Sequence, residues 1–158
     1  MEKDDIRAKF TKIKVASQAG VKALHKPFLL LITLAKYSRG EPRFFLFSEI
    51  EKDLTMLLVK YGPPRGTYHP EFPFWNLQND GIWELINDEN LQNRKGRSEP
   101  GRGELVKNKV MGGLKREIYL SFSRDPVFLH ELVQLILEKF IPEQIREDVL
   151  RDVGLDCG

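Results

Sequence analysis

One uninterrupted apolar segment constrains the fold of this chain more than any other feature. It reads FLLLITLA from Phe28 to Ala35 and follows the tripeptide HKP. In a helical projection the segment is apolar almost all round, and such a helix is stable only where other elements cover it. Proline favours the first turn of a helix and glycine favours the position after its end, which places the ends near Pro27 and Gly40. The sequence therefore predicts a central buried helix.

Further helices are predicted on both sides of this segment. Each has an amphipathic period or a recognisable start, such as proline in the first turn or serine followed three residues later by glutamate. The predicted helices are Arg7–Ala19, a helix from the capping box Ser48/Glu51 to Tyr61, Glu104–Met111 ended by Gly112-Gly113, Val127–Phe140 after Asp125-Pro126, and a last helix from Pro142 toward Val153.

Strand patterns are fewer and shorter. Phe74–Leu77 and Ile82–Ile86 flank the turn QNDG, and Asp-Gly between two apolar runs favours a β-hairpin. Arg43–Phe47 and Glu117–Phe122 are the other expected strands. The predicted fold class is α+β: a mainly helical single domain over residues 1–158, with its core at about 5–150 and a small antiparallel β-sheet or hairpin.

The composition argues against several classes of protein. The chain has a single cysteine, Cys157, so neither an internal disulfide framework nor a cysteine metal cluster can form. The first ten residues are charged and lack the apolar core of a signal peptide, and the longest apolar run is far shorter than a membrane span. We expect a soluble cytoplasmic protein with no membrane contact.

The net charge of +2 hides an uneven distribution of basic residues. Residues 6–40 contain eight lysines and arginines and no aspartate or glutamate, and a second basic block lies over residues 94–116. Such a polarised chain indicates a basic face directed at a polyanion. The alternative is that these side chains form solvated helix faces whose charges balance in space, and the charge pattern alone leaves both readings open.

The stretch HPEFPFWNLQND, from His69 to Asp80, combines two prolines with the stiffest apolar residues of the chain. The prolines indicate a loop, and apolar residues in a loop either fill the core or build a binding surface. We expect Phe74 or Trp75 in the core, because a strand is predicted to begin there. Phe72 and Pro73 then point outward, where an apolar pocket in a basic rim suits a ligand.

The sequence contains no complete set of catalytic or metal-binding residues. The three histidines lack the spacing of metal ligands, and His130 fits a structural position in a helix. Glu104 and Lys107 resemble part of a nuclease motif, but no paired aspartate precedes them. We therefore expect no enzyme activity, no cofactor and no metal. Two alternatives stay open: a small metal-dependent nuclease that uses Glu104, and a protein-interaction module that uses the acidic C-terminal helix.

Two motifs together resemble a known family. LHKPFLLLITL and, about 45 residues later, HPEFPFWNLQNDGIWEL look like the DNA sulfur-binding domain of McrA-type, phosphorothioate-dependent type IV restriction endonucleases. The resemblance extends from about residue 5 to about residue 150. In those enzymes the domain is usually joined to an HNH nuclease domain, and no HNH motif lies outside the matched region here. The resemblance implies a stand-alone, non-catalytic reader of phosphorothioate-modified double-stranded DNA.

The resemblance also implies roles for individual residues. The HKP step places His25 and Lys26 at the modified phosphate, and the FPFWN step places Phe72 and Pro73 against the sulfur with Asn76 at the pocket floor. The family often has arginine where Lys26 stands, and tyrosine is familiar where Phe72 stands. The rim residues expected to contact DNA phosphates or bases are Gln18, Lys22, Arg65, Tyr68, His69 and Arg97.

The chemistry of sulfur suits such a site. Sulfur is larger, more polarizable and less strongly hydrated than oxygen, so it gains dispersion contacts in a pocket that offers no hydrogen-bond donor. An ordinary phosphate oxygen would lose water there at a cost on the order of 1–3 kcal/mol. We expect a monomer or weak dimer whose partner is phosphorothioate DNA, with a separate nuclease as a further candidate partner.

Overall fold

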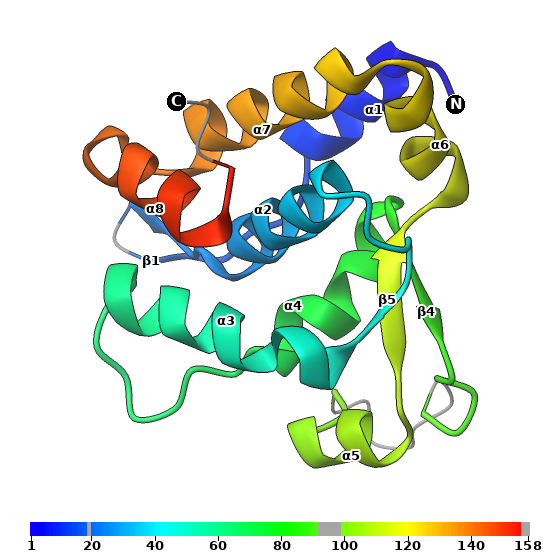
Figure 1. Cartoon of the computed structure of the whole chain (residues 1–158). Helices are drawn as coiled ribbons and strands as arrows, with labels where there is room; N and C mark the ends of the chain where they lie inside the picture. Colours follow the sequence, from blue (N-terminus) through cyan, green and yellow to red (C-terminus); the bar gives the residue numbers. More distant parts are fainter. Residues whose placement is uncertain (19, 92–98, 156–158) are drawn as a thin grey trace.

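The computed structural model describes residues 1–18, 20–91 and 99–155. Within these residues the chain forms a mainly helical α+β domain, as predicted (Figure 1). The helices are α1 (Lys3–Thr11), α2 (His25–Ser38), α3 (Phe47–Tyr61), α4 (Glu71–Asn76), α5 (Arg102–Lys107), α6 (Arg116–Arg124), α7 (Pro126–Phe140) and α8 (Arg146–Val153), with 3-10 turns at Leu77–Asp80 (η1) and Glu143–Ile145 (η2). The strands are β1 (Ser17–Gln18), β2 (Val21–Lys22), β3 (Phe45–Leu46), β4 (Trp83–Ile86) and β5 (Met111–Leu114).

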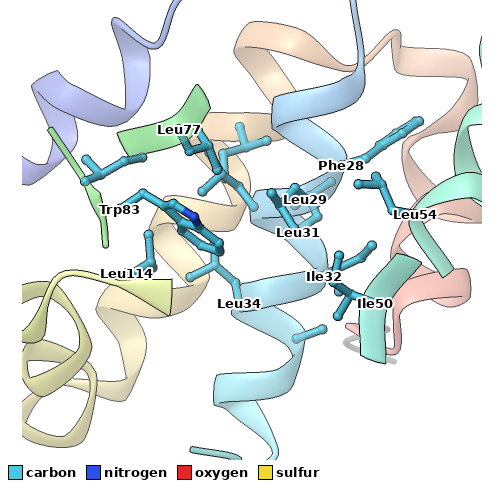
Figure 2. Packing of buried hydrophobic residues seen from close by; sticks show 14 of the residues in the cluster. Phe28, Leu29, Leu31, Ile32, Leu34, Ile50, Leu54, Leu77, Trp83 and Leu114 are labelled. Atoms are coloured by element: carbon cyan, nitrogen blue, oxygen red, sulfur yellow. The ribbon is translucent and has the colours of Figure 1, made fainter. Parts of the chain in front are cut away.

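Helix α2 is the centre of the fold. Every residue from Pro27 to Ala35 is buried, and the helix packs against α3, α4, α7 and α8. Figure 2 shows Ile32 on the side of Ile50 from α3, and Leu34 on the side of Trp83 from β4. The all-round apolar segment therefore is the buried helix that the sequence predicts, and its first turn carries the HKP motif to the edge of the core.

The larger sheet has the strand order β3-β5-β4, and all its pairs are antiparallel. Gly112 and Gly113 lie in its middle strand, so the prediction that they end a helix was wrong. A Cβ atom at residue 112 would come within 2.7 Å of the Trp83 ring, and one at residue 113 within 2.2 Å of the Arg43 carbonyl oxygen. The two glycines are needed because neighbouring groups approach the strand this closely.

The predicted helix Arg7–Ala19 is much shorter in the structure. Helix α1 ends at Thr11, and the chain then runs extended into the β1–β2 hairpin. Two hydrogen bonds hold this conformation: the Lys14 N–H donates to the Asp80 carboxylate at 2.9 Å, and the Ala23 N–H donates to the Ala16 carbonyl at 2.8 Å. Tertiary bonding therefore overrides the local helical pattern after Thr11.

The predicted strand over Phe74–Leu77 was also wrong, and with it the Asp-Gly hairpin. Residues 71–76 form helix α4, which continues into the 3-10 turn η1. The buried apolar residues are Pro70, Pro73, Phe74 and Leu77, which follow the spacing i, i+3, i+4, i+7 of a helical face. Strand β4 accordingly pairs with β5 and not with residues 74–77.

Smaller corrections concern α3, α5 and α6. Helix α3 already contains Phe47, so Ser48 does not cap it, although the predicted end at Tyr61 is confirmed. Helix α5 ends at Lys107, four residues before the predicted end. Residues 117–122 belong to α6 and not to a strand, because the buried Ile118 and Phe122 lie one helical turn apart.

The predictions for the chain after Asp125 are closer to the structure. Helix α7 begins at Pro126 and ends at Phe140, and Pro142 precedes η2 and α8. His130 is exposed on α7 rather than built into the core. None of the helices in the described residues is long and apolar enough to cross a membrane.

Candidate functional site

A cavity of about 250 Å³ opens where four segments meet. The segments are the chain around the β1–β2 hairpin, the first turn of α2, the loop after α3, and helix α4. We call this cavity the Phe72–Pro73 pocket. Its lining residues are Lys14, Val15, Ala16, Ala23, His25, Lys26, Arg65, His69, Phe72, Pro73 and Asn76. The lining combines aliphatic and aromatic groups with cations, and it contains no carboxylate.

Helix α4 holds the apolar wall of the pocket in place. Phe74 and Leu77 are fully buried, and the Trp83 indole N–H donates to the Phe74 carbonyl at 3.0 Å. This anchoring fixes Pro73, which is buried but still lines the pocket, and leaves Phe72 38% exposed. The wall is therefore a rigid proline ring beside an accessible phenyl ring.

His69 reinforces the exposed ring. Its imidazole stacks on Phe72 with ring centroids 4.4 Å apart and planes 3° from parallel. Nδ1 of His69 lies 3.0 Å from Oε2 of the buried Glu71. His69 adopts a left-handed backbone conformation, with φ of 49°, which a residue with a side chain rarely takes. The turn before α4 thus sets the position of both rings.

His25 lies at the start of α2 and is partly buried. Burial lowers its pKa below the usual value, and the nearby positive charge of Arg65 lowers the pKa further. The imidazole is therefore neutral at neutral pH. A neutral ring can line an apolar pocket without the desolvation cost that a charge would carry.

Lys26 is paired. Its Nζ donates to Oδ2 of Asp80 at 2.6 Å, and the two side chains are 15% and 3% exposed. Asn76 donates through Nδ2 to Oε1 of Glu99 at 3.3 Å, which ties the end of α4 to the chain before α5. Both residues line the pocket.

A second cavity of about 610 Å³ adjoins the first and shares Ala16, Ala23, His25 and Arg65 with it. Lys22 and Tyr68 also line this second cavity. The Tyr68 hydroxyl accepts a hydrogen bond from the Arg65 N–H at 3.1 Å, which closes the loop between α3 and α4. The second cavity therefore adds Lys22 to the cations near the pocket, and Arg65 belongs to the lining of both cavities.

The structure thus brings together nine of the eleven predicted site residues. His25, Lys26, Arg65, His69, Phe72, Pro73 and Asn76 line the pocket, and Lys22 and Tyr68 line its neighbour. Gln18 lies in β1, paired with Val21, and Arg97 lies outside the described residues. The sequence reasoning missed Lys14, Val15, Ala16 and Ala23. The predicted helix over residues 7–19 concealed the first three of these, although Lys14 belongs to the acid-free basic stretch.

Glu104, the residue considered for nuclease chemistry, stabilises the start of a helix. Glu104 lies in the first turn of α5, where its Oε1 accepts a hydrogen bond from the N–H of Gly101, the residue before the helix, at 3.4 Å. The described residues contain no group of three or more histidine, cysteine, aspartate or glutamate side chains suited to hold a metal ion. Glu104 therefore has a helix-capping role in this fold.

Comparisons with known proteins agree with this fold. The sulfur-binding domain of ScoMcrA complexed with phosphorothioated DNA has a TM-score of 0.81 and 24% identity, with 94% of each chain covered. That of SprMcrA, also complexed with phosphorothioated DNA, has a TM-score of 0.78 and 21% identity, covering 99% of this chain and 96% of the other. A structure of the sulfur-binding and SRA domains of ScoMcrA complexed with phosphorothioated DNA has a TM-score of 0.80 and 23% identity. The match covers 48% of that chain.

No curated protein sequence matches the chain. The family model described as ScoMcrA-like, DNA sulfur-binding domain matches residues 3–157. This match covers nearly the whole sequence, and it includes both motifs that build the Phe72–Pro73 pocket. The chain belongs to the ScoMcrA-like DNA sulfur-binding domain family.

Proposed function

We propose that this chain binds double-stranded DNA in which sulfur replaces one non-bridging backbone oxygen, and that the sulfur enters the Phe72–Pro73 pocket. Binding is the whole function, with no catalytic step. Family membership and the phosphorothioated DNA in the related complexes support the ligand. The observation that carries the proposal is the pocket itself: a rigid apolar wall of Phe72 and Pro73 with cations and no carboxylate around it.

The pocket discriminates sulfur from oxygen because its wall has no hydrogen-bond donor. Proline has no backbone N–H, and a phenyl ring offers no donor, so an oxygen placed there loses water without replacement. Sulfur is less strongly hydrated and more polarizable, and it gains dispersion contacts with both rings. The pocket therefore selects sulfur mainly by penalising oxygen.

The cationic rim supplies affinity that does not depend on the modification. We assign Lys22 and Arg65, which line the adjoining cavity, to contacts with neighbouring phosphates, and we assign Arg97 the same role from the sequence. His25 and Lys26 contact the modified phosphate group itself. Gln18, Tyr68 and His69 are the candidates for contacts with base edges.

The direct test compares matched duplexes with and without a single sulfur, each sulfur diastereomer separately. An unreplaced hydration shell costs about 1–3 kcal/mol, so we expect one diastereomer to bind roughly 5- to 150-fold more tightly than the plain duplex. Fluorescence polarisation at fixed salt measures both affinities. Equal affinity for all three duplexes would refute the proposal.

Pro73→Ala tests the pocket assignment. The loss of ring contacts should weaken binding of the sulfur duplex by roughly fivefold and leave the plain duplex nearly unchanged. Pro142→Ala is the matched control, because Pro142 is exposed and lines neither cavity. If Pro73→Ala left the discrimination intact, the sulfur would lie elsewhere.

We further propose that the protein acts in the cytoplasm as a monomer or weak dimer, and that any cleavage that follows binding comes from a nuclease activity outside this domain. The helix-capping bond of Glu104 supports this separation of roles. Incubation of modified and plain plasmids with magnesium or manganese should leave both intact. Metal-dependent cutting by the purified chain would contradict it, and sedimentation measures the oligomeric state.

A further inference from the structure

Asp80 lies behind the wall of the Phe72–Pro73 pocket and connects two parts of it. Oδ2 of Asp80 accepts a hydrogen bond from Lys26 Nζ at 2.6 Å, and Oδ1 accepts the backbone N–H of Lys14 at 2.9 Å. Lys14 and Lys26 both line the pocket, whereas Asp80 itself does not. One carboxylate, only 3% exposed, therefore fixes the positions of two cationic residues.

This pairing also determines the charge of the pocket wall. An ammonium group has three donors, and Asp80 takes one, so Lys26 keeps donors that can reach a phosphate. The pair as a whole nevertheless carries no net charge. Moving Lys26 away from Asp80 would leave an uncompensated carboxylate in a buried position, which is strongly unfavourable. Lys26 is therefore held as half of an ion pair.

We propose that Asp80 is a specificity-determining positioning residue, which keeps the pocket unfavourable for an ordinary phosphate oxygen by neutralising Lys26. This inference rests on the proposed sulfur-binding function. An oxygen that has lost water gains most from a full positive charge, because charge-assisted hydrogen bonds to oxygen are strong. Sulfur is a weak acceptor and gains less. An unpaired Lys26 would thus offset much of the desolvation penalty that the apolar wall imposes on an oxygen.

Asp80→Asn tests the proposal, because it removes the charge and keeps an oxygen for the Lys14 N–H. We expect the plain duplex to bind about fivefold more tightly and the sulfur duplex to gain less, so that the sulfur-to-oxygen affinity ratio falls. A newly available cation should also steepen the dependence of log affinity on log salt by about 0.9. An unchanged or higher ratio, in a variant with a cooperative thermal unfolding transition, would overturn the inference.

The double variant Lys26→Met/Asp80→Asn keeps the proposal testable even if Asp80→Asn does not fold. It replaces the ion pair with a neutral pair of similar size. Lys26 then loses the donors that contact the modified phosphate, so both duplexes should bind more weakly, but the salt slope should stay as in the native protein because the native pair carries no net charge. A slope shallower by about 0.9 would show that Lys26 acts as a full cation and would overturn the inference.

Asp152→Asn is the matched control. Asp152 pairs with Lys60 at 2.8 Å, with the same atom types as the Lys26–Asp80 pair, and neither residue lines the pocket. The sulfur-to-oxygen ratio should not change in this variant, and an equal fall in the ratio would overturn the proposed role of Asp80. If the native protein itself shows no preference for sulfur, the proposed function fails before Asp80 is tested.

Discussion

Two cavities of about 250 Å³ each lie against different parts of α2, and their linings differ in charge. The Phe72–Pro73 pocket includes the first turn of α2 and has no carboxylate in its lining. The other, which we call the α3–α8 cavity, is lined by Lys36 of α2 and by Arg39, which follows α2. Residues of α3 and α8 complete its lining, and these include Asp53 and Asp152. Equal volume therefore does not mean an equal ligand, because carboxylates belong to the lining of the α3–α8 cavity but not, among the described residues, to that of the Phe72–Pro73 pocket.

The ion pairs of the two cavities differ in the same way. In the α3–α8 cavity, the hydrogen bond from Lys60 lowers the pKa of Asp152, but both side chains are solvent-accessible and water screens the pair. At the Phe72–Pro73 pocket, Asp80 is withdrawn from solvent and only its cationic partners reach the lining. The pocket thus presents donors and apolar groups to a ligand while its carboxylate stays behind the wall.

The largest effect should come from making the two cavities alike in charge. Ala16→Asp places a carboxylate in the pocket lining at an exposed position. Like charges brought together at an interface cost several kcal/mol, so we expect affinity for both duplexes to fall by about 100-fold. Fluorescence polarisation measures the loss.

Met56→Asp is the control for that substitution. Met56 is 58% exposed and lines the α3–α8 cavity, so the same added charge should leave DNA affinity within about twofold, since exposed charges at a distance are screened. A comparable loss in the two variants would mean that net charge, and not the pocket, governs binding.

The scaffold of the pocket was easier to predict than its walls. The apolar run over Phe28–Ala35 can be stable only inside a core, and proline marks the starts of α2 and α7, so these helices followed from residue chemistry alone. Residues Phe74–Leu77 were misread as a strand because Trp75, Leu77, Trp83 and Leu85 alternate in type. The helical spacing of Pro70, Pro73, Phe74 and Leu77 was the stronger signal.

Some of the site residues could be identified from the sequence, and others could not. The motif residues His25, Lys26, Phe72 and Pro73 came from family resemblance and do meet in one cavity. The wall formed by Lys14–Ala16 depends on a hydrogen bond to Asp80, 66 residues away in the sequence. A local sequence pattern cannot predict a hydrogen bond between residues so far apart, so this wall could be identified only from the structure.

A smaller effect is expected from Phe72→Ala, which removes one apolar wall and its stack with His69. A stacked pair is worth about 0.5–1.5 kcal/mol, and we expect a roughly fivefold loss of affinity for the sulfur duplex with less change for the plain one. Val127→Ala, at a 75% exposed position on α7, is the matched truncation. An equal loss for both duplexes would assign Phe72 to general backbone contact.

Lys22→Ala should have a smaller and less selective effect. Lys22 lines the adjoining cavity, and its Nζ lies 3.2 Å from the Lys139 carbonyl oxygen, near the end of α7. Removal should weaken both duplexes equally, by about threefold, and make the salt slope shallower by about 0.9. Lys52→Ala, exposed on α3, should change neither quantity. A selective effect of Lys22→Ala on the sulfur duplex would shift the boundary of the sulfur site.

The smallest expected effect is a dependence of stability on pH. It concerns only the pocket, because the pocket lining contains His25 and His69, whereas the described lining of the α3–α8 cavity contains no histidine. Burial and Arg65 lower the pKa of His25, so the unfolded chain binds its proton more readily than the folded one. The stability that depends on neutral His25 is therefore complete above about pH 6.5 and is lost as the pH falls below that value.

Urea unfolding at pH 7.5 and 5.5 measures this loss in the native protein and in His25→Gln, where it should be smaller. Arg65→Ala should raise the pKa of His25, as seen by NMR titration of the ring, and should also reduce the loss. An identical pH dependence in the native protein and in His25→Gln would show that His25 is not held neutral by the pocket, and the electrostatic contrast between the two cavities would then rest on the carboxylates alone.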